Sequence, residues 1–283
     1  MQDKIQKASI LLDALPYIKK FAKQTIVIKY GGAAQINPKL KDEFARDIVL
    51  LYLVGIRIII VHGGGKSINN VLDKLKIESH FVDGLRVTDE KAMEVVEMVL
   101  SGNVNKEITT LLNFNGAKAI GLSGKDANFI KAKTADGGKY GLVGDITQVN
   151  SEMLLQLIND GFIPVIAPIA SGDDEKHPGY NINADLAASE IAKSVKAKKV
   201  IFLTDTIGVL DKDKNLLSKL KKDDIEKLKI DGTINGGMIP KVDACLKAIE
   251  GGVDDAHIID GRIQHSIILE LFTNEGIGTI IKK

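Results

Sequence analysis

Two lysines of this sequence lie beside glycine-rich segments that could bind an anion. Lys29 ends an apolar run and is followed closely by Gly31 and Gly32. Lys241 comes directly after Thr233–Pro240 (TINGGMIP), a glycine-rich segment that is expected to open a helix. Glycines let backbone N–H groups approach a ligand closely, and helix N-termini attract negative charge. A lone lysine at a strand end is usually solvated, but two lysines at such segments are what phosphoryl transfer needs.

Another glycine-rich segment, Ile59–Ser67 (IIVHGGGKS), also leads from an apolar run into an expected helix. It is not a P-loop, because Ile60 stands where that motif needs glycine, and Ile68 likewise excludes the dinucleotide fingerprint. Hydrolases use a similar run as an oxyanion loop, but this sequence has no Gly-x-Ser-x-Gly nucleophile motif. A phosphate or carboxylate site of another type remains, and a histidine such as His62 is more often structural than catalytic.

Two further segments place a charged or amide side chain at the start of a helix. Gly84–Asp89 (GLRVTD) contains Arg86, which could clamp a carboxylate or simply lie on the surface. Tyr180–Asp185 (YNINAD) leads into another expected helix. Its Asp185 could complement the helix dipole, with Asn183 as the cap, or it could orient the two lysines by charge.

The elements that must position these residues alternate along the chain. Apolar, β-branched runs predict strands at Thr25–Tyr30, Arg57–Val61, Ala117–Leu122, Ile163–Ile169, Val200–Leu203 and His257–Ile259. Amphipathic stretches predict helices at Leu40–Val54, Lys66–Leu75, Asp89–Gly102, Asn150–Asn159 and Ala184–Lys196. This alternation indicates an α/β protein with a mainly parallel sheet and helices on both faces. Ligands of such sheets bind beyond the carboxyl ends of the strands, so Leu203–Asp211 (LTDTIGVLD) is either a nucleotide contact or a plain turn.

Polar stretches suggest how the chain divides. The best domain boundary is Ser171–Tyr180 (SGDDEKHPGY), which is polar and contains glycine and proline. It separates the expected units 24–175 and 176–283. A second polar stretch, Lys133–Gly144 (KTADGGKYGLVG), predicts a hairpin or flap.

Composition argues against several functional classes. Lysine and arginine number 38 and aspartate and glutamate 37, so the net charge is +1 and a dedicated nucleic-acid binder is not expected. No apolar run reaches roughly 18 residues, so we expect neither a membrane-spanning helix nor a membrane partner. The one cysteine, Cys245, excludes an internal disulfide and fits a reducing cytosol, which favours a cytoplasmic protein.

Taken in order, the segments KYGG, HGGG, GLRVTD, NINAD, LTDTIGVL and GGMIPK resemble the amino acid kinase family along nearly the whole chain. GLRVTD and NINAD resemble the branch that acts on N-acetyl-L-glutamate rather than on carbamate, aspartate or uridylate. The resemblance implies a three-layer αβα sandwich around a mainly parallel open sheet of about eight strands. It also implies ATP-dependent phosphorylation of the γ-carboxylate of N-acetyl-L-glutamate, the second step of arginine biosynthesis. Residues 24–175 would bind N-acetyl-L-glutamate, and residues 176–283 would bind ATP.

The resemblance also implies roles for individual residues. Lys29 and Lys241 would stabilise the transition state, Asp185 would hold both lysines, and Gly32 would line the phosphoryl path. The acceptor substrate would be bound by Gly64, Gly65, Arg86 and Asn181. The nucleotide would be bordered by Gly31, Asp205, Thr206, Gly208, Leu210, Thr233 and Asn235. No metal ligand can be read from the sequence, so Mg²⁺ is expected to arrive on the phosphates of ATP.

Two stretches resemble the arginine-inhibited branch of the family. One is residues 1–23, an expected helix in which Pro16 should produce a kink or a restart. The other runs from His257 to Arg262 and continues into Glu270–Thr273 and Gly276–Thr279. In that branch the N-terminal helices interlace dimers into a homohexamer, and L-arginine binds between this helix and the C-terminal part. The arginine contacts implied here are Tyr17, Lys199, Glu270 and Gly276. Alternatively, the helix packs on its own domain and the C-terminal stretch merely completes the sheet.

Two positions depart from the family pattern without touching the residues assigned above. Lys66 stands where proline is common after HGGG, and Gln35 follows KYGGAA where methionine is common. Two other functions stay open. One is a relative that phosphorylates another amino-acid carboxylate, such as aspartate or glutamate. The other is a sensor scaffold that binds arginine or a partner without catalysis, which the presence of Lys29, Lys241 and Asp185 disfavours.

Overall fold

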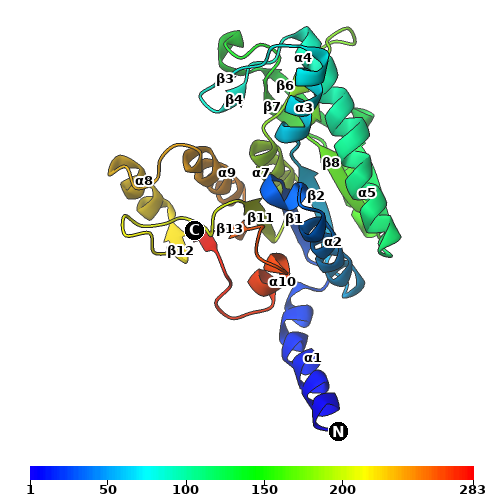
Figure 1. Ribbon diagram of the computed structural model, residues 1–283, viewed down its shortest axis with the longest axis vertical. Helices are drawn as coiled ribbons and strands as arrows, with labels where there is room; N and C mark the ends of the chain where they lie inside the picture. Colours follow the sequence, from blue (N-terminus) through cyan, green and yellow to red (C-terminus); the bar gives the residue numbers. More distant parts are fainter.

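A single eight-stranded sheet lies at the centre of the computed structural model, which describes residues 1–283 apart from the side chains of Asp3 and Lys7. In spatial order its strands are β12 (Lys219–Lys221), β14 (Thr279–Lys282), β13 (Asp255–Asp260), β11 (Lys199–Thr204), β1 (Thr25–Tyr30), β2 (Arg57–His62), β8 (Ile163–Ala167) and β5 (Ala119–Ser123). From β13 to β5 all neighbours pair in parallel, whereas β14 runs antiparallel to β13. The predicted α/β fold with a mainly parallel sheet is therefore confirmed (Figure 1).

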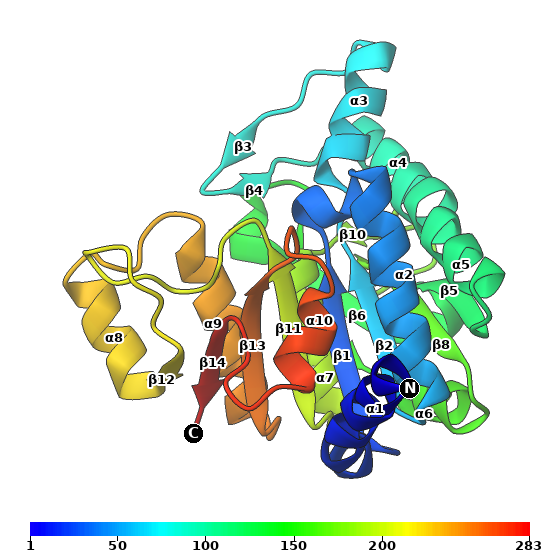
Figure 2. The ribbon, with the colours of Figure 1, turned by 60° about the horizontal axis from the view of Figure 1, so that its bottom comes forward.

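Helices cover both faces of the sheet and make it the middle of three layers. One face carries α2 (Pro38–Leu53), α3 (Gly65–Leu75), α4 (Glu90–Glu97), the π-helical segment η2 (Met98–Val104), α5 (Asn105–Phe114) and α10 (Ser266–Leu271). The other carries α6 (Glu152–Asn159), α7 (Ala184–Ser194), α8 (Lys222–Ile230) and α9 (Met238–Glu250). In Figure 2, α2 and α10 lie in front of the sheet. Each face has its own apolar core, since Ile26 and Ile28 of β1 pack into the first and Val27 into the second.

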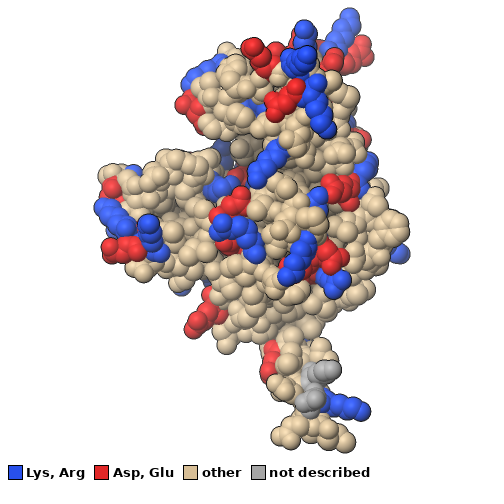
Figure 3. All heavy atoms as spheres, in the orientation of Figure 1, with Lys and Arg blue, Asp and Glu red and all other residues tan. Residues whose placement is uncertain are grey.

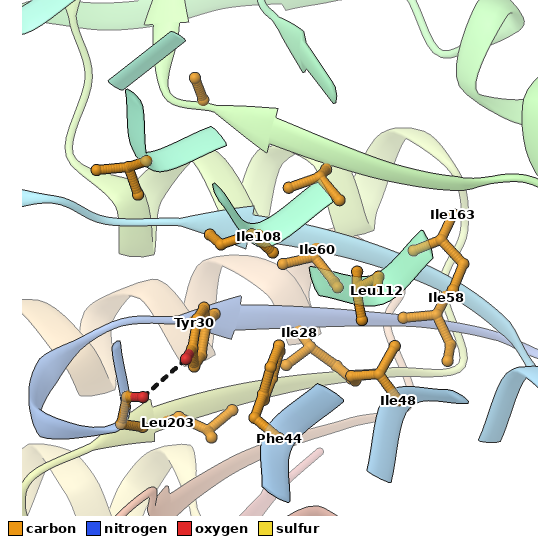
Figure 4. Close-up of a cluster of buried hydrophobic side chains, with 14 of the residues drawn as sticks. Ile28, Tyr30, Phe44, Ile48, Ile58, Ile60, Ile108, Leu112, Ile163 and Leu203 are labelled. Carbon is orange, nitrogen blue, oxygen red and sulfur yellow. Dashed lines mark hydrogen bonds between the residues drawn. The ribbon is translucent and has the colours of Figure 1, made fainter. Parts of the chain in front are cut away.

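The first core holds the carboxyl end of β1 in place. Tyr30 is 2% exposed and stacks on Phe44 of α2, with ring centroids 3.8 Å apart. Its hydroxyl donates a hydrogen bond to the Ala34 carbonyl at 2.7 Å (Figure 4). Burial raises the pKa of Tyr30, so its hydroxyl stays a neutral donor. The short helix η1 (Gly32–Gln35) is therefore fixed directly beyond the end of the strand.

Most predicted elements are present, with some ends shifted. The strand predicted at Thr25–Tyr30 is β1 with the same ends. The hairpin predicted at Lys133–Gly144 joins β6 (Ile130–Thr134) to β7 (Gly144–Val149) in an antiparallel pair. The helix predicted at Asp89–Gly102 is α4 followed directly by η2. The short strands β12 and β14 were not predicted, because runs of three and four residues carry too little periodicity to read.

Both predicted main units contribute strands to the one sheet. They meet where β1 pairs with β11. The predicted boundary at Ser171–Tyr180 connects β9 (Ile169–Ala170) to β10 (Tyr180–Asn181), and these two short strands pair with each other. A further small hairpin, formed by β3 (Phe81–Val82) and β4 (Leu85–Arg86), stands beyond the sheet on the side of α3 (Figure 2).

The N-terminal helix α1 (Gln2–Phe21) projects from one end of the molecule (Figure 1). It is continuous through Pro16, so the restart that the proline suggested does not occur. A proline removes one helical hydrogen bond, and here that loss does not end the helix. The side chains of Ile10, Leu11 and Leu12 are 60%, 72% and 65% exposed. No described helix of the chain combines the length and apolar character needed to cross a membrane.

Candidate active site

The glycine-rich segments meet at one edge of the sheet because the strands before them are parallel neighbours. Tyr30 at the end of β1 pairs with His62 at the end of β2, and β1 pairs on its other side with β11. Gly31–Gly32 therefore lies between Gly63–Gly65 and Asp205–Gly208. Figure 3 shows that the surface is hollowed between the part that carries β3 and β4 and the part that carries α8 and α9.

A buried aspartate holds two lysines at this edge. Asp185 is 7% exposed; its Oδ1 lies 3.0 Å from Lys29 Nζ and its Oδ2 lies 2.9 Å from Lys241 Nζ. Lys29 belongs to β1, Asp185 to the first turn of α7 and Lys241 to the start of α9. Asn183 caps α7, since its side chain accepts hydrogen bonds from the amides of Asp185 and Leu186. Both predicted roles of this segment are therefore present, because Asn183 caps the helix and Asp185 contacts both lysines.

The charge of this cluster suits an anionic ligand. Burial by itself would raise the pKa of Asp185, but the positive charges of Lys29 and Lys241 outweigh burial and lower that pKa to about 2. Asp185 is therefore ionised at neutral pH. Two ammonium groups and one carboxylate leave a net positive charge beside the N-termini of α7 and α9. Such an arrangement can stabilise negative charge that develops on a transferred group.

Asp205 ties the loop beyond β1 to the loop beyond β11. Its Oδ1 accepts a hydrogen bond from the Ala33 amide at 2.7 Å. Gly32 has a φ of +68°, and a Cβ at this position would lie only 2.4 Å from the same oxygen, so glycine is required. A Cβ at Gly31 would lie 3.1 Å from Lys29 Nζ. Asp205, which the family resemblance assigns to the nucleotide, thus also anchors the loop that contains Gly32.

The residues implied in acceptor binding line one cavity of about 210 Å³. Gly64 and Gly65 line it, as do Arg86 and Asn181. Most of the remaining wall is apolar and consists of Ile68, Phe81, Leu85, Leu100, Val143, Pro168 and Ile182. Ala184 lines the cavity as well, so the cavity reaches the start of α7, directly before Asp185.

Arg86 is a buried cation whose described hydrogen-bond partners are all neutral. It is 6% exposed, and its guanidinium donates to Ser79 Oγ and to Asn69 Oδ1, both at 2.6 Å. The guanidinium also lies over the Phe81 ring, 4.7 Å from its centroid. Burial lowers the pKa of Arg86. Within the part of the chain that the structure describes, no carboxylate lies within 4.0 Å of this guanidinium. A bound carboxylate would supply the missing negative charge.

The residues implied in nucleotide binding, apart from Gly31, lie in two loops. Asp205–Leu210 follows β11, and Thr233–Asn235 precedes α9. An ion pair of 3.3 Å between Lys212 and Asp231 joins the segment just after the first loop to the segment just before the second. The first loop contains Asp205, Thr206, Gly208 and Leu210, and the second contains Thr233 and Asn235. The described residues contain no group of three His, Cys, Asp or Glu side chains that could hold a metal ion.

A second charged cluster lies at the other end of the parallel strands, where β11 and β13 begin. Lys199 Nζ lies 2.6 Å from Asp255 Oδ2 and 2.8 Å from His257 Nε2. His257 Nδ1 in turn lies 2.5 Å from Glu270 Oε1. Lys199 and Glu270, both implied in arginine binding, are therefore joined through one buried histidine.

Glu270 is held from several sides. Its Oε2 accepts hydrogen bonds from the amides of Ile277 at 2.7 Å and Gly278 at 3.2 Å. Burial alone would raise the pKa of Glu270, but the hydrogen bonds from His257 and from these amides lower it. Gly276 has a φ of +67°, and a Cβ there would lie 2.7 Å from the same carboxylate. The chain therefore passes close to Glu270 only because residue 276 is glycine.

Tyr17 reaches the same region from α1. Its hydroxyl donates to Asn274 Oδ1 at 2.6 Å, and its ring stacks on Phe272 at 6.1 Å between centroids. His257 and Asp255, which also belong to this cluster, were not predicted from the sequence. Their two-residue spacing was the available signal, since side chains at i and i+2 of a strand share a face. Burial lowers the pKa of His257.

Substitution of Asp185 is expected to lower the stability of the fold by an amount that depends on pH. Asp185→Asn leaves two partly buried ammonium groups without their shared counter-ion, so the free energy of unfolding at pH 7 should fall by about 2–3 kcal/mol, which corresponds to the lowered pKa of Asp185. Because the pKa of Asp185 lies at about 2 rather than 3.8, its charge stabilises the fold fully above about pH 4 and loses effect towards pH 2. Urea denaturation should show the difference between wild type and variant shrinking over this interval. Asp173→Asn, an exposed control, should show no such trend, and a constant difference for Asp185→Asn would contradict the prediction.

Known proteins resemble the chain over its whole length. Residues 24–260 match the model of the amino acid kinase family. The acetylglutamate kinase of Campylobacter fetus subsp. fetus is 64% identical over 282 residues, which cover 100% of both chains. That of Sulfurimonas denitrificans is 62% identical over 281 residues, which cover 99% of both chains.

Solved structures share the fold. N-acetylglutamate synthase from Neisseria gonorrhoeae, complexed with coenzyme A and N-acetyl-glutamate, is 26% identical with a TM-score of 0.86, over 98% of this chain and 63% of that chain. The same synthase complexed with coenzyme A and L-arginine is 25% identical with a TM-score of 0.82, over 98% and 65%. This chain thus spans less than two thirds of the synthase. Carbamate kinase from Giardia lamblia bound to AMP-PNP, 16% identical with a TM-score of 0.71 over 93% and 99%, shares the fold. By these matches the chain belongs to the amino acid kinase family, where it is a phosphotransferase enzyme that groups with the acetylglutamate kinases.

Proposed function

We propose that this enzyme transfers the γ-phosphoryl group of ATP to the γ-carboxylate of N-acetyl-L-glutamate, forming N-acetylglutamyl 5-phosphate and ADP. The observation that carries the proposal is the buried Lys29–Asp185–Lys241 cluster next to the cavity that Arg86 lines. Two ammonium groups held by one carboxylate suit the spread negative charge of a phosphoryl group in transfer. The names of the full-length relatives support the same reaction.

The cavity favours an N-acylated amino acid as the acceptor. The Arg86 guanidinium would pair with its α-carboxylate, and the Asn181 amide would bind a neighbouring polar group. The apolar walls would pack against the acetyl methyl group, whereas a free α-ammonium group would be buried among them without a partner. The amides of Gly64 and Gly65, at the start of α3, would bind the γ-carboxylate.

In the proposed reaction an oxygen of the γ-carboxylate attacks the γ-phosphorus of ATP. The bond from that phosphorus to the bridging oxygen breaks, and ADP leaves with the bridging oxygen. Lys29 and Lys241 would stabilise the negative charge on the transferring phosphoryl group and the leaving oxygen. Asp185 would keep both ammonium groups in place without entering the reaction, and the Gly32 backbone would line the phosphoryl path. The attacking carboxylate is already ionised, so no general base is needed.

The nucleotide would lie along Gly31 and the two loops Asp205–Leu210 and Thr233–Asn235. Mg²⁺ would enter as part of the MgATP substrate, because this ion commonly binds through nucleotide phosphates and keeps several waters. Lys241, at the start of α9, would then lie where the helix dipole also attracts phosphate.

We further infer that L-arginine inhibits the enzyme at the cluster of Tyr17, Lys199, Glu270 and Gly276. A buried, ionised carboxylate such as that of Glu270 suits a guanidinium group, and the related synthase structure contains L-arginine. The exposed apolar side chains of α1 support a homohexamer, a trimer of dimers, in which these helices pack together. The reaction would serve arginine biosynthesis in the cytoplasm, where a lone buried cysteine stays reduced.

The proposed reaction predicts ADP release that requires the acetylated substrate. With MgATP and N-acetyl-L-glutamate, ADP formation and the acyl phosphate trapped by hydroxylamine should increase together. L-Glutamate and L-aspartate are the controls, and both should turn over at least about tenfold more slowly because their ammonium groups lose hydration in the cavity. Equal turnover of a control would contradict recognition of the acetyl group. No turnover of any of these substrates would contradict the proposed function.

Loss of either lysine should slow the chemical step. Lys29→Ala and Lys241→Ala should each lower kcat by about 10²–10³-fold, as removal of one transition-state donor does. Lys227→Ala, on the exposed face of α8, is the matched control and should keep the wild-type kcat. A wild-type kcat in Lys29→Ala or Lys241→Ala would remove that lysine from the mechanism.

Deletion of residues 1–23 should abolish hexamer formation and weaken arginine inhibition, because it removes the exposed apolar face of α1 together with Tyr17. Light scattering would report the mass, and the ADP assay would report inhibition. Tyr17→Phe keeps the ring that stacks on Phe272 but loses the hydroxyl, so it separates the arginine contact from assembly. Unchanged mass with unchanged inhibition would refute both inferences.

A further inference from the structure

Gly63, the first residue of the glycine-rich loop beyond β2, makes three hydrogen-bond contacts through its backbone. The Gly63 amide donates to the Tyr30 carbonyl at 2.8 Å. The Gly63 carbonyl oxygen lies 2.9 Å from Gln35 Nε2 and 2.9 Å from His62 Nδ1. A carbonyl oxygen can only accept, so both nitrogens donate and His62 carries its proton on Nδ1.

The other side of the His62 ring is fixed by Asn105, the first residue of α5. Both side chains are fully buried, with 0% exposure. Asn105 Nδ2 donates to the carbonyls of Val165 at 2.8 Å and Leu122 at 3.2 Å, and it lies 3.2 Å from His62 Nε2. Because the neutral His62 ring carries its proton on Nδ1, its Nε2 can only accept, and it faces this donor group of Asn105. Burial lowers the pKa of His62 to about 4, and the ring therefore stays neutral at physiological pH.

The orientation of the Gly63 carbonyl determines that of the next amide. A trans peptide points its C=O and N–H in opposite directions, and the described chain has no cis peptide. With its carbonyl turned towards Gln35 and His62, this peptide turns the Gly64 N–H away from them. Gly64 lines the cavity, and no described backbone or side-chain group accepts from its N–H. Leu100 of η2 confines the loop from another side, because a Cβ on Gly64 would lie 2.4 Å from Leu100 Cδ2.

We propose that Gln35 and His62 are positioning residues that present the Gly64 N–H to the carboxylate being phosphorylated. The inference rests on the proposed function. Gln35 ends η1, so its side chain also links the loop that contains Gly32 to the loop that contains Gly64.

The substitution Gln35→Met removes the donor and keeps the side-chain length. The KM for N-acetyl-L-glutamate should rise about three- to tenfold, which corresponds to loss of one neutral hydrogen bond, while the KM for MgATP stays unchanged. A purely structural role for Gln35 would not separate the two KM values. Gln148→Met, at an exposed position of β7, is the matched control and should change neither. Calorimetric titration with N-acetyl-L-glutamate in the absence of ATP should show the same loss of affinity.

A pair of His62 variants tests the same peptide independently and decides the question if Gln35→Met does not fold. The amide of His62→Asn can take the place of Nδ1 and donate to the Gly63 carbonyl. The longer His62→Gln places its amide near Nε2 instead and loses that contact. We expect the KM for N-acetyl-L-glutamate to be several-fold higher in His62→Gln than in His62→Asn.

An unchanged KM for N-acetyl-L-glutamate in Gln35→Met, or equal KM values in the two His62 variants, overturns the positioning role while the reaction stands. A wild-type enzyme that binds N-acetyl-L-glutamate without turnover overturns the proposed function instead. In that case a calorimetric loss in Gln35→Met still supports the positioning role. A wild type that neither binds nor converts this substrate overturns both.

Discussion

The buried carboxylate of Asp185 between Lys29 and Lys241 is the contact on which the rest of the site depends. Taking charges out of water is costly, and one buried ion pair barely recovers that cost. Here one carboxylate serves two ammonium groups, and the resulting attraction outweighs burial and holds the pKa of Asp185 at about 2. The contact also joins β1, α7 and α9, so the two halves of the sheet and the second helix layer are fixed relative to one another where a phosphoryl group would pass.

Backbone groups, rather than side chains, would make many of the contacts to the substrates. Their directions depend on side chains that do not reach the ligand themselves. Asp205 holds the Ala33 amide, and Gln35 and His62 hold the Gly63 carbonyl. Glycine at these turns allows the close approach but leaves the peptide planes free, which is why anchoring side chains are needed. The side chains that hold these backbone groups therefore come from the ends of β1, β2 and β11 or from the loops that follow them.

The cluster of Lys199, His257 and Glu270 and the candidate active site lie at opposite ends of the same strand. β11 begins at Lys199, which contacts Asp255 and His257, and it ends at Thr204, directly before Asp205. At a rise of about 3.3 Å per residue, the strand separates the two by roughly 17 Å. β11 lies buried between β1 and β13, so a displacement at Lys199 has a packed and continuous route to the loop that Asp205 anchors. This geometry gives the proposed feedback by arginine a physical basis.

From sequence alone, the alternation of apolar strands with amphipathic helices determined the α/β class and the parallel sheet, because strands buried on both faces must be apolar throughout. The ordered glycine-rich motifs likewise indicated the family, and parallel strand ends brought those motifs to one edge. Only the tertiary structure decided which side chains meet. That Arg86 meets Ser79 and Asn69, that His257 joins Lys199 to Glu270, and that Gln35 reaches Gly63 all depend on contacts between separate elements. Periodicity reports which face of an element is buried, but the partner across a contact is selected by how elements pack, and local sequence does not encode that.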